Sequence, residues 1–170
     1  MIVLPFYYFK YGLRDFSLQT ALLLDLSSSV TNQFLSELRN AVSRFINVVA
    51  LEQNYIGIYG FAGGEELIEI QTFTLNKDLL LNSLESIGEQ IDKSTNLFGG
   101  IIYGIDELND RISNPPSIFR EGLMVVFTDG RDRAGYFTED EAIDAIRQSD
   151  ATAYGISVGG EIDPEQQTVC

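Results

Sequence analysis

Oxygen-bearing side chains follow apolar runs of this chain at positions where they could bind a metal ion. Asp25 ends one apolar run and is followed by Ser27 and Ser29 at alternate positions. Asp129 ends a second apolar run, and Thr95 lies in a polar loop between the two. All five side chains offer oxygen donors, which suit a hard divalent cation, Mg²⁺ first and Mn²⁺ next. Two carboxylates roughly neutralise a dication, so hydroxyls and water could fill most other positions and one position could accept a partner's carboxylate.

Each of these short signals has a simpler interpretation when it stands alone. Ser27 or Ser29 is typical of a helix N-cap, and Asp129-Gly130 is typical of a turn after a strand. The run 131–133 (Arg-Asp-Arg) is interpreted as a solvated loop rather than as the rim of a site. The metal-site hypothesis therefore depends on whether the fold brings the three stretches together.

Strand-like and helix-like segments alternate along the chain. Residues 19–26 and 123–128 are almost continuously apolar, which is typical of strands buried on both faces of a parallel sheet. Residues 55–62 and 67–74 flank a Gly-rich turn and predict a hairpin whose second strand is antiparallel at an edge. The remaining signals predict helices after the serines (capped by Thr31 or Ser29), after Asn76, over 98–112 and after Thr138, and a last strand over 151–158. This pattern predicts an α/β domain with a doubly wound, mainly parallel sheet.

The two acidic strand ends are expected to meet at one edge of this sheet. With strand 19–26 in the centre, the hairpin lies on one side and the later strands on the other, so the strand order reverses between the strands that end in Asp25 and Asp129. Ligands of open α/β sheets bind at such a reversal, beyond the carboxyl ends of the strands. The loop that holds Thr95 is the natural third wall, and Gly99-Gly100 would let the backbone approach closely there.

The alternation of the serines has a geometric interpretation. Alternate side chains share one side of an extended or gently turning segment. Asp25, Ser27 and Ser29 would then face one point, while Leu26 and Ser28 face elsewhere.

Composition excludes several classes of function. The chain has 170 residues and no histidine, so neither a Ser-His-Asp unit nor a His-ligated zinc site can be assembled. Its single cysteine is the last residue, Cys170, so no internal disulfide forms. The formal net charge of −14 argues against nucleic acid and anionic membranes as partners. The apolar start, residues 1–9, is too short for a spanning helix, so no direct membrane insertion is expected from this segment.

Three motifs together resemble one known family. Asp25-Leu26-Ser27-Ser28-Ser29 is similar to the DxSxS motif of von Willebrand factor type A (vWA, or integrin I-type) domains. Residues 94–100 resemble the threonine loop of that family, and Thr128-Asp129-Gly130 resembles its TDG motif. The resemblance covers roughly residues 17 to 165.

This resemblance implies a Rossmann-like fold, with helices on both faces of the sheet, around a metal-ion-dependent adhesion site (MIDAS). Ser27, Ser29 and Thr95 would be direct ligands, and Asp25 and Asp129 would bind directly or through water. The implied domain is residues 17–170, after an N-terminal arm or extra strand over 1–16. The family usually continues with another strand and a final helix, so the domain is expected to be truncated at its C-terminus, where residues 163–165 (Asp-Pro-Glu) look like a helix start.

The favoured function is a Mg²⁺- or Mn²⁺-dependent protein-binding module, for adhesion or interaction, in which an Asp or Glu of the partner completes the metal shell. The chain is not expected to be an enzyme. One alternative is a Mg²⁺-dependent phosphoryl-transfer or hydrolytic enzyme with Asp25 as nucleophile; Ser27 in place of a second acid weakens it. Another is an intracellular scaffold that works with an ATPase. The sequence leaves the compartment open, with an extracytoplasmic or cell-surface setting favoured over the cytoplasm.

Overall fold

The computed structural model describes residues 16–50, 52–88, 94–113, 119–130 and 132–159. In these residues the elements follow the chain in the order β1 (Phe16–Asp25), α2 (Ser28–Val49), β2 (Asn54–Phe61), β3 (Ile68–Thr74), α3 (Lys77–Ser83), the short 3₁₀-helix η2 (Leu84–Ser86), α4 (Leu97–Ser113), β4 (Phe119–Thr128), α5 (Glu139–Gln148) and β5 (Ala151–Ser157). The predicted arm over residues 1–16 and the predicted helix start at 163–165 fall outside the described residues, except for Phe16, which begins β1.

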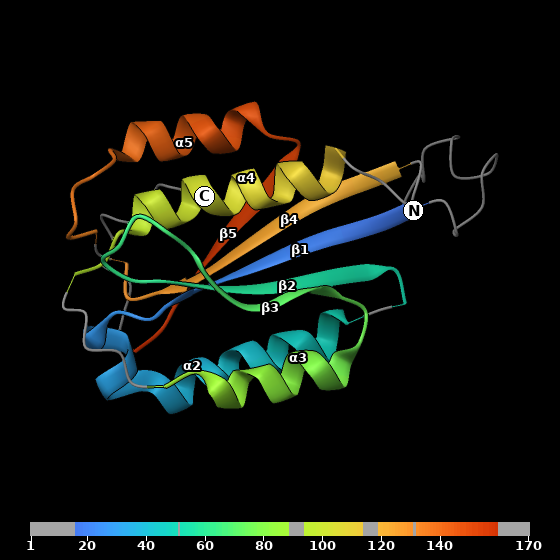
Figure 1. The fold of residues 1–170 in the computed structure, drawn as a ribbon, viewed down its shortest axis with the longest axis horizontal. Helices are drawn as coiled ribbons and strands as arrows, with labels where there is room; N and C mark the ends of the chain where they lie inside the picture. Colours follow the sequence, from blue (N-terminus) through green and yellow to red (C-terminus); the bar gives the residue numbers. More distant parts are fainter. Residues whose placement is uncertain (1–15, 51, 89–93, 114–118, 131, 160–170) are drawn as a thin grey trace, which may run out of the picture.

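The strands form one sheet in the order β3-β2-β1-β4-β5. β1 is parallel to both of its neighbours, β2 and β4, and β4 is parallel to β5. Only β3, at one edge of the described sheet, is antiparallel. The predicted fold class is therefore confirmed, including the central place of β1 and the reversal of strand order between β1 and β4. The carboxyl ends of β1 and β4 lie together at the left of Figure 1.

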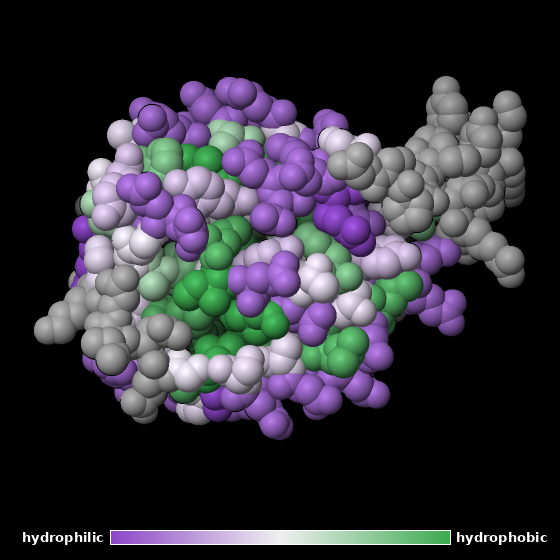
Figure 2. Space-filling model, in the orientation of Figure 1, coloured by the Kyte–Doolittle hydropathy of each residue, from purple (hydrophilic) through white to green (hydrophobic). Residues whose placement is uncertain are grey.

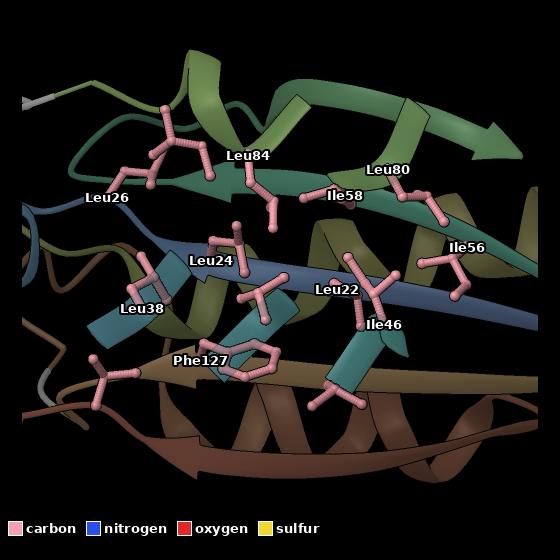
Figure 3. Packing of buried hydrophobic residues seen from close by; sticks show 14 of the residues in the cluster. Leu22, Leu24, Leu26, Leu38, Ile46, Ile56, Ile58, Leu80, Leu84 and Phe127 are labelled. Carbon is pink, nitrogen blue, oxygen red and sulfur yellow. The ribbon is translucent and has the colours of Figure 1, made fainter. Parts of the chain in front are cut away.

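Helices cover both faces of the sheet. α2 and α3 pack on one face and α4 and α5 on the other (Figure 1). Alternate side chains of β1 point to opposite faces of the sheet. Leu22 and Leu24 belong to the hydrophobic cluster beneath α2 and α3, whereas Ala21 and Leu23 belong to the one beneath α4. Figure 3 shows the first cluster, in which Phe127 of β4 lies beside the leucines of β1. This two-sided burial explains why β1 is apolar without interruption.

Two small residues let α4 lie close to the sheet. A Cβ added to Gly100 would come within 2.8 Å of the Phe61 ring, and one added to Gly104 would come within 2.5 Å of a methyl group of Leu23. The backbone approach expected at Gly99-Gly100 is thus present at Gly100. The first turn of α4 thus lies over the end of β2 at Phe61, and the next turn lies over Leu23 of β1.

The helix starts show where local sequence signals decide structure. The Asn76 side chain caps α3 by accepting hydrogen bonds from the N–H groups of Asp78 and Leu79. Thr138 and Glu141 form the predicted capping box of α5. The predicted cap of α2 is wrong, because its N-cap position is Ser27 and no side chain makes a capping hydrogen bond there.

Apolar surface gathers in the middle of the face seen in Figure 2, surrounded by polar residues. Ile68 in β3 and Leu79 in α3 are among the exposed large apolar side chains, at 44% and 48% exposure. Within the described residues, no helix combines the length and apolar character needed to cross a bilayer.

Candidate metal site

Asp25 ends β1 with a buried carboxyl group. Its side chain is fully buried (0% exposed). Oδ1 accepts a hydrogen bond from the N–H of Ser27 at 2.9 Å, and Oδ2 accepts one from the hydroxyl of Thr128 at 2.7 Å. Burial raises the pKa of the Asp25 carboxyl, and the nearby Asp129 charge raises it further, whereas the bonds from Ser27 and Thr128 lower it. The net result is a raised pKa.

Ser27 and Ser29 bring their hydroxyls together beside this carboxyl. Their Oγ atoms lie 3.1 Å apart. Ser27 is buried and holds the N-cap position of α2, yet its hydroxyl does not cap the helix. The sequence analysis attributed the alternation to an extended or gently turning segment, whereas the chain is already helical from Ser28. The first turn of α2 carries Ser29 back towards Ser27, and Leu26 points instead into the core.

Thr95 offers a hydroxyl oxygen with no partner among the described residues. The residue is 1% exposed, and its Oγ1 is buried without a hydrogen bond. Its main chain is held firmly, because its carbonyl oxygen accepts from the N–H groups of Arg133 at 2.8 Å and Ala134 at 3.0 Å. A buried, unpaired hydroxyl costs free energy unless a ligand pairs with it.

Asp129 presents a second side-chain oxygen that has no hydrogen-bond partner among the described residues. Its Oδ1 is buried without a hydrogen-bond partner. Asp129 follows Thr128, whose hydroxyl bonds to the Asp25 carboxyl, and β1 and β4 are paired up to Leu24 and Phe127, so the two acidic residues lie at neighbouring strand ends. The predicted meeting of the two acidic strand ends is therefore present in the structure.

A ring of hydrogen bonds ties the segments of this edge together. Its four bonds are Leu26 N to Phe61 O at 2.8 Å, Asn96 N to Ala62 O at 2.7 Å, Arg133 N to Thr95 O at 2.8 Å, and Thr128 Oγ1 to Asp25 Oδ2 at 2.7 Å. Each bond joins segments that are distant in sequence. The end of β1, the end of β2, the loop before α4 and the turn after β4 consequently enclose one site.

The chemistry of this donor set fits a hard divalent cation. In the part of the chain that the structure describes, no three His, Cys, Asp or Glu side chains lie together as a metal-binding group. A cation here would therefore rely on hydroxyls as well as carboxylates, as the predicted set does. The unpaired oxygens of Thr95 and Asp129 and the hydroxyl pair of Ser27 and Ser29 are donors of the kind that Mg²⁺ and Mn²⁺ accept.

The family model of the von Willebrand factor type A domain matches residues 21–169. The chain belongs to this family. No curated protein matches it by sequence.

Solved structures share the vWA fold with this domain. BatB, a conserved hypothetical protein from Bacteroides thetaiotaomicron, has 19% identity and a TM-score of 0.64, with 82% of this chain and 65% of that chain covered. Proximal thread matrix protein 1 from the mussel byssus, described with a zinc-occupied MIDAS motif, has 15% identity and a TM-score of 0.67, with 84% and 38% covered. The vWF domain of the type V pili tip protein Mfa5 from Porphyromonas gingivalis has 13% identity and a TM-score of 0.53, with 73% and 43% covered. At these identities the likeness shows the fold, and the chain spans less than two thirds of each of these proteins.

The sequence patterns did not single out three residues whose side chains make hydrogen bonds in this site. Thr128 donates to Asp25 and accepts from the N–H of Gly130 at 3.0 Å; its place before Asp129 in the TDG motif was the available signal. Asn96 donates to the carbonyl of Gly64 at 2.9 Å, and its side-chain oxygen accepts from an N–H in the first turn of α4; an Asn just before a helix was the signal. Asp132, interpreted as part of a solvated loop, accepts hydrogen bonds from two N–H groups. No pattern in the sequence pointed to it.

Proposed function

We propose that this vWA domain is a protein-binding module that depends on a divalent cation, Mg²⁺ or Mn²⁺. Asp25, Ser27, Ser29, Thr95 and Asp129 would hold the ion. The observation that carries the proposal is the pair of buried, unpaired oxygens, Thr95 Oγ1 and Asp129 Oδ1, at the edge that also holds the Ser27–Ser29 hydroxyl pair. A native fold rarely leaves such atoms without a partner, so they point to a ligand.

Electrostatics at Asp25 support the same proposal. Burial penalises the charged carboxylate, and the Ser27 N–H and the Thr128 hydroxyl offset only part of that penalty. Positive charge at this position would offset the remainder. When bound, a cation held by two carboxylates and neutral hydroxyls supplies an electrophilic position for an Asp or Glu carboxylate of a partner protein.

The relatives are compatible with an interaction module. One, named as a byssus matrix protein, has a zinc-occupied MIDAS motif, and another is named as a pilus tip protein. An adhesion-type role, with an acidic side chain of the partner completing the site, is the function proposed for this chain by analogy with them.

We further propose that the site is not catalytic. A nucleophilic Asp needs an oxygen that can reach the substrate. Asp25 is fully buried, and each of its oxygens already accepts a hydrogen bond. A phosphatase assay with p-nitrophenyl phosphate and Mg²⁺ tests this point, and turnover that disappears in Asp25→Asn would contradict it.

Calorimetric titration of the EDTA-treated protein with MgCl₂ and MnCl₂ tests the cation site. We expect binding in the wild type and its loss in Ser27→Ala and Ser29→Ala. Ser28→Ala is the matched control, since it removes a hydroxyl from the same turn, and it should bind as the wild type does. Equal binding by all three variants would contradict the assignment of the ligands.

A peptide array tests the partner. Peptides that contain Asp or Glu should bind in Mg²⁺, and matched peptides with Asn or Gln should not. Binding should vanish in EDTA and in Asp25→Ala. Binding that persists in EDTA would refute cation dependence.

A further inference from the structure

We propose that Asp132 is a positioning residue of this site, which clamps the loop that carries Thr95 to the turn that carries Asp129. The inference rests on the proposed cation-binding function. It assigns a role to a side chain outside the five proposed ligands.

Asp132 bridges two segments with its two carboxylate oxygens. Oδ1 accepts a hydrogen bond from the N–H of Phe98, in the first turn of α4, at 3.3 Å. Oδ2 accepts one from the N–H of Gly135, in its own turn, at 3.0 Å. Because one oxygen holds each segment, the side chain is a rigid link between them.

The link acts beside a second one made by the main chain. The two residues after Asp132, Arg133 and Ala134, both donate their N–H groups to the carbonyl oxygen of Thr95. Three hydrogen bonds therefore join residues 95–98 to residues 132–134. One involves a side chain, so it is the one that a single substitution can remove without altering the main chain.

The joined segments carry the two unpaired oxygens of the site. Thr95 lies three residues before Phe98, and Asp129 lies three residues before Asp132. The bond between Phe98 and Asp132 would therefore limit how far the Thr95 loop and the Asp129 turn can move apart. A metal site keeps its affinity only when its donors are held within about 0.5 Å of the productive geometry.

Local conformation makes Asp132 suited to this task. Gly135 donates its N–H to the Asp132 carboxylate and has a φ of +68°, a left-handed conformation that glycine adopts without strain. The positive end of the α4 dipole lies at Phe98, so a carboxylate is favoured there. With both oxygens accepting from N–H groups, Asp132 acts through the main chain, which distinguishes it from the five proposed ligands.

The test compares Mg²⁺ and Mn²⁺ affinities, measured by calorimetry, for three variants. Asp132→Ala removes both acceptors and should weaken binding roughly tenfold, the low end of what outer partners of metal ligands contribute. Asp132→Asn keeps the shape of the side chain but only one acceptor oxygen, so it can hold only one of the two segments and should also bind the cations more weakly than the wild type. Asn76→Ala is the matched control. It also removes an acceptor from two N–H groups at a helix start, but at α3, beyond the end of β3, and it should leave cation affinity unchanged.

The outcomes separate this inference from the proposed function. If the wild type binds neither Mg²⁺ nor Mn²⁺, both the proposed cation-binding function and the role of Asp132 are refuted. If the wild type binds and Asp132→Ala binds equally tightly, only the role of Asp132 is refuted. If Asp132→Asn binds as tightly as the wild type, a single acceptor suffices and the two-ended link is refuted. Should Asp132→Ala fail to fold, the isosteric Asp132→Asn decides, and wild-type affinity in it would overturn the role.

Discussion

Replacing Thr128 with Val should destabilise the metal-free protein by about 2–3 kcal/mol at pH 7. The Thr128 hydroxyl donates at 2.7 Å to the fully buried carboxyl of Asp25, and a hydrogen bond to a charged group contributes about 1.5–3 kcal/mol. Val fills nearly the same volume, so little cavity cost adds to this. The N–H of Gly130, which also loses its acceptor, is partly exposed and can bond to water. In a domain of this size the change lowers Tm by about 4–12 °C.

Urea unfolding in EDTA measures this difference, with Thr128→Ser as the control. Ser keeps the hydroxyl and loses one methyl group, which costs about 1 kcal/mol. The Val penalty should also shrink at low pH. The folded-state pKa of Asp25 is raised above its ordinary 3.8, so protonated Asp25 contributes stability that is complete below about pH 3.8 and is lost as pH rises through the raised value. A Val variant as stable as the Ser variant at pH 7 would refute this account of the buried carboxylate.

Two further predictions concern packing and capping. Gly100→Ala should lower the free energy of unfolding, measured in urea, by about 1–2 kcal/mol, because the new Cβ would lie 2.8 Å from the Phe61 ring and this overpacking outweighs the roughly 1 kcal/mol gain in helix propensity. Gly64→Ala is the control: its Cβ would meet nothing within 4 Å, so it should be neutral. Equal losses in the two variants would contradict the packing argument. The hydrogen bonds that Thr138 donates lower the pKa of Glu141 below its ordinary 4.5, so the capping box is intact above that pH and is lost as pH falls through the lowered value. In an NMR titration the Thr138 amide should shift with a midpoint below 4.5 in the wild type and stay flat in Glu141→Gln; a midpoint at or above 4.5 would count against the box.

The fold was predictable because its main signals are strong and local. Unbroken apolar runs marked the strands that end in Asp25 and Thr128, and polar caps marked the helices that begin after Asn76 and Thr138. The first residue of a strand was harder to predict from the sequence. β1 begins at Phe16 rather than Gln19, because the ladder with β4 starts there, and main-chain pairing leaves no trace in the apolar pattern.

The site was predictable in its residue types and in the edge that holds it, but not in its local geometry. The sequence placed Asp25 and Asp129 at one edge, and the structure agrees. It could not show that Ser29 reaches Ser27 through a helical turn, since a Ser before a helix also fits a cap. It could not show the bonds to Asp132 either, because their donors are main-chain N–H groups that any residue type supplies. Whether the five oxygens hold a metal stays a prediction until the titration is made.

The hydrogen bond between Thr128 and Asp25 spans 103 residues of sequence, and this has a consequence for the protein while it is being made. At about 5–20 residues per second, the ribosome needs about 5–20 s after Asp25 to supply Thr128. During that interval β1 is an apolar strand without its β4 neighbour, a form prone to pair with other chains. A charge at the end of such a strand acts as a gatekeeper against that pairing. We therefore expect Asp25, which is fully buried in the finished domain, to be exposed in the nascent chain and to oppose that pairing there.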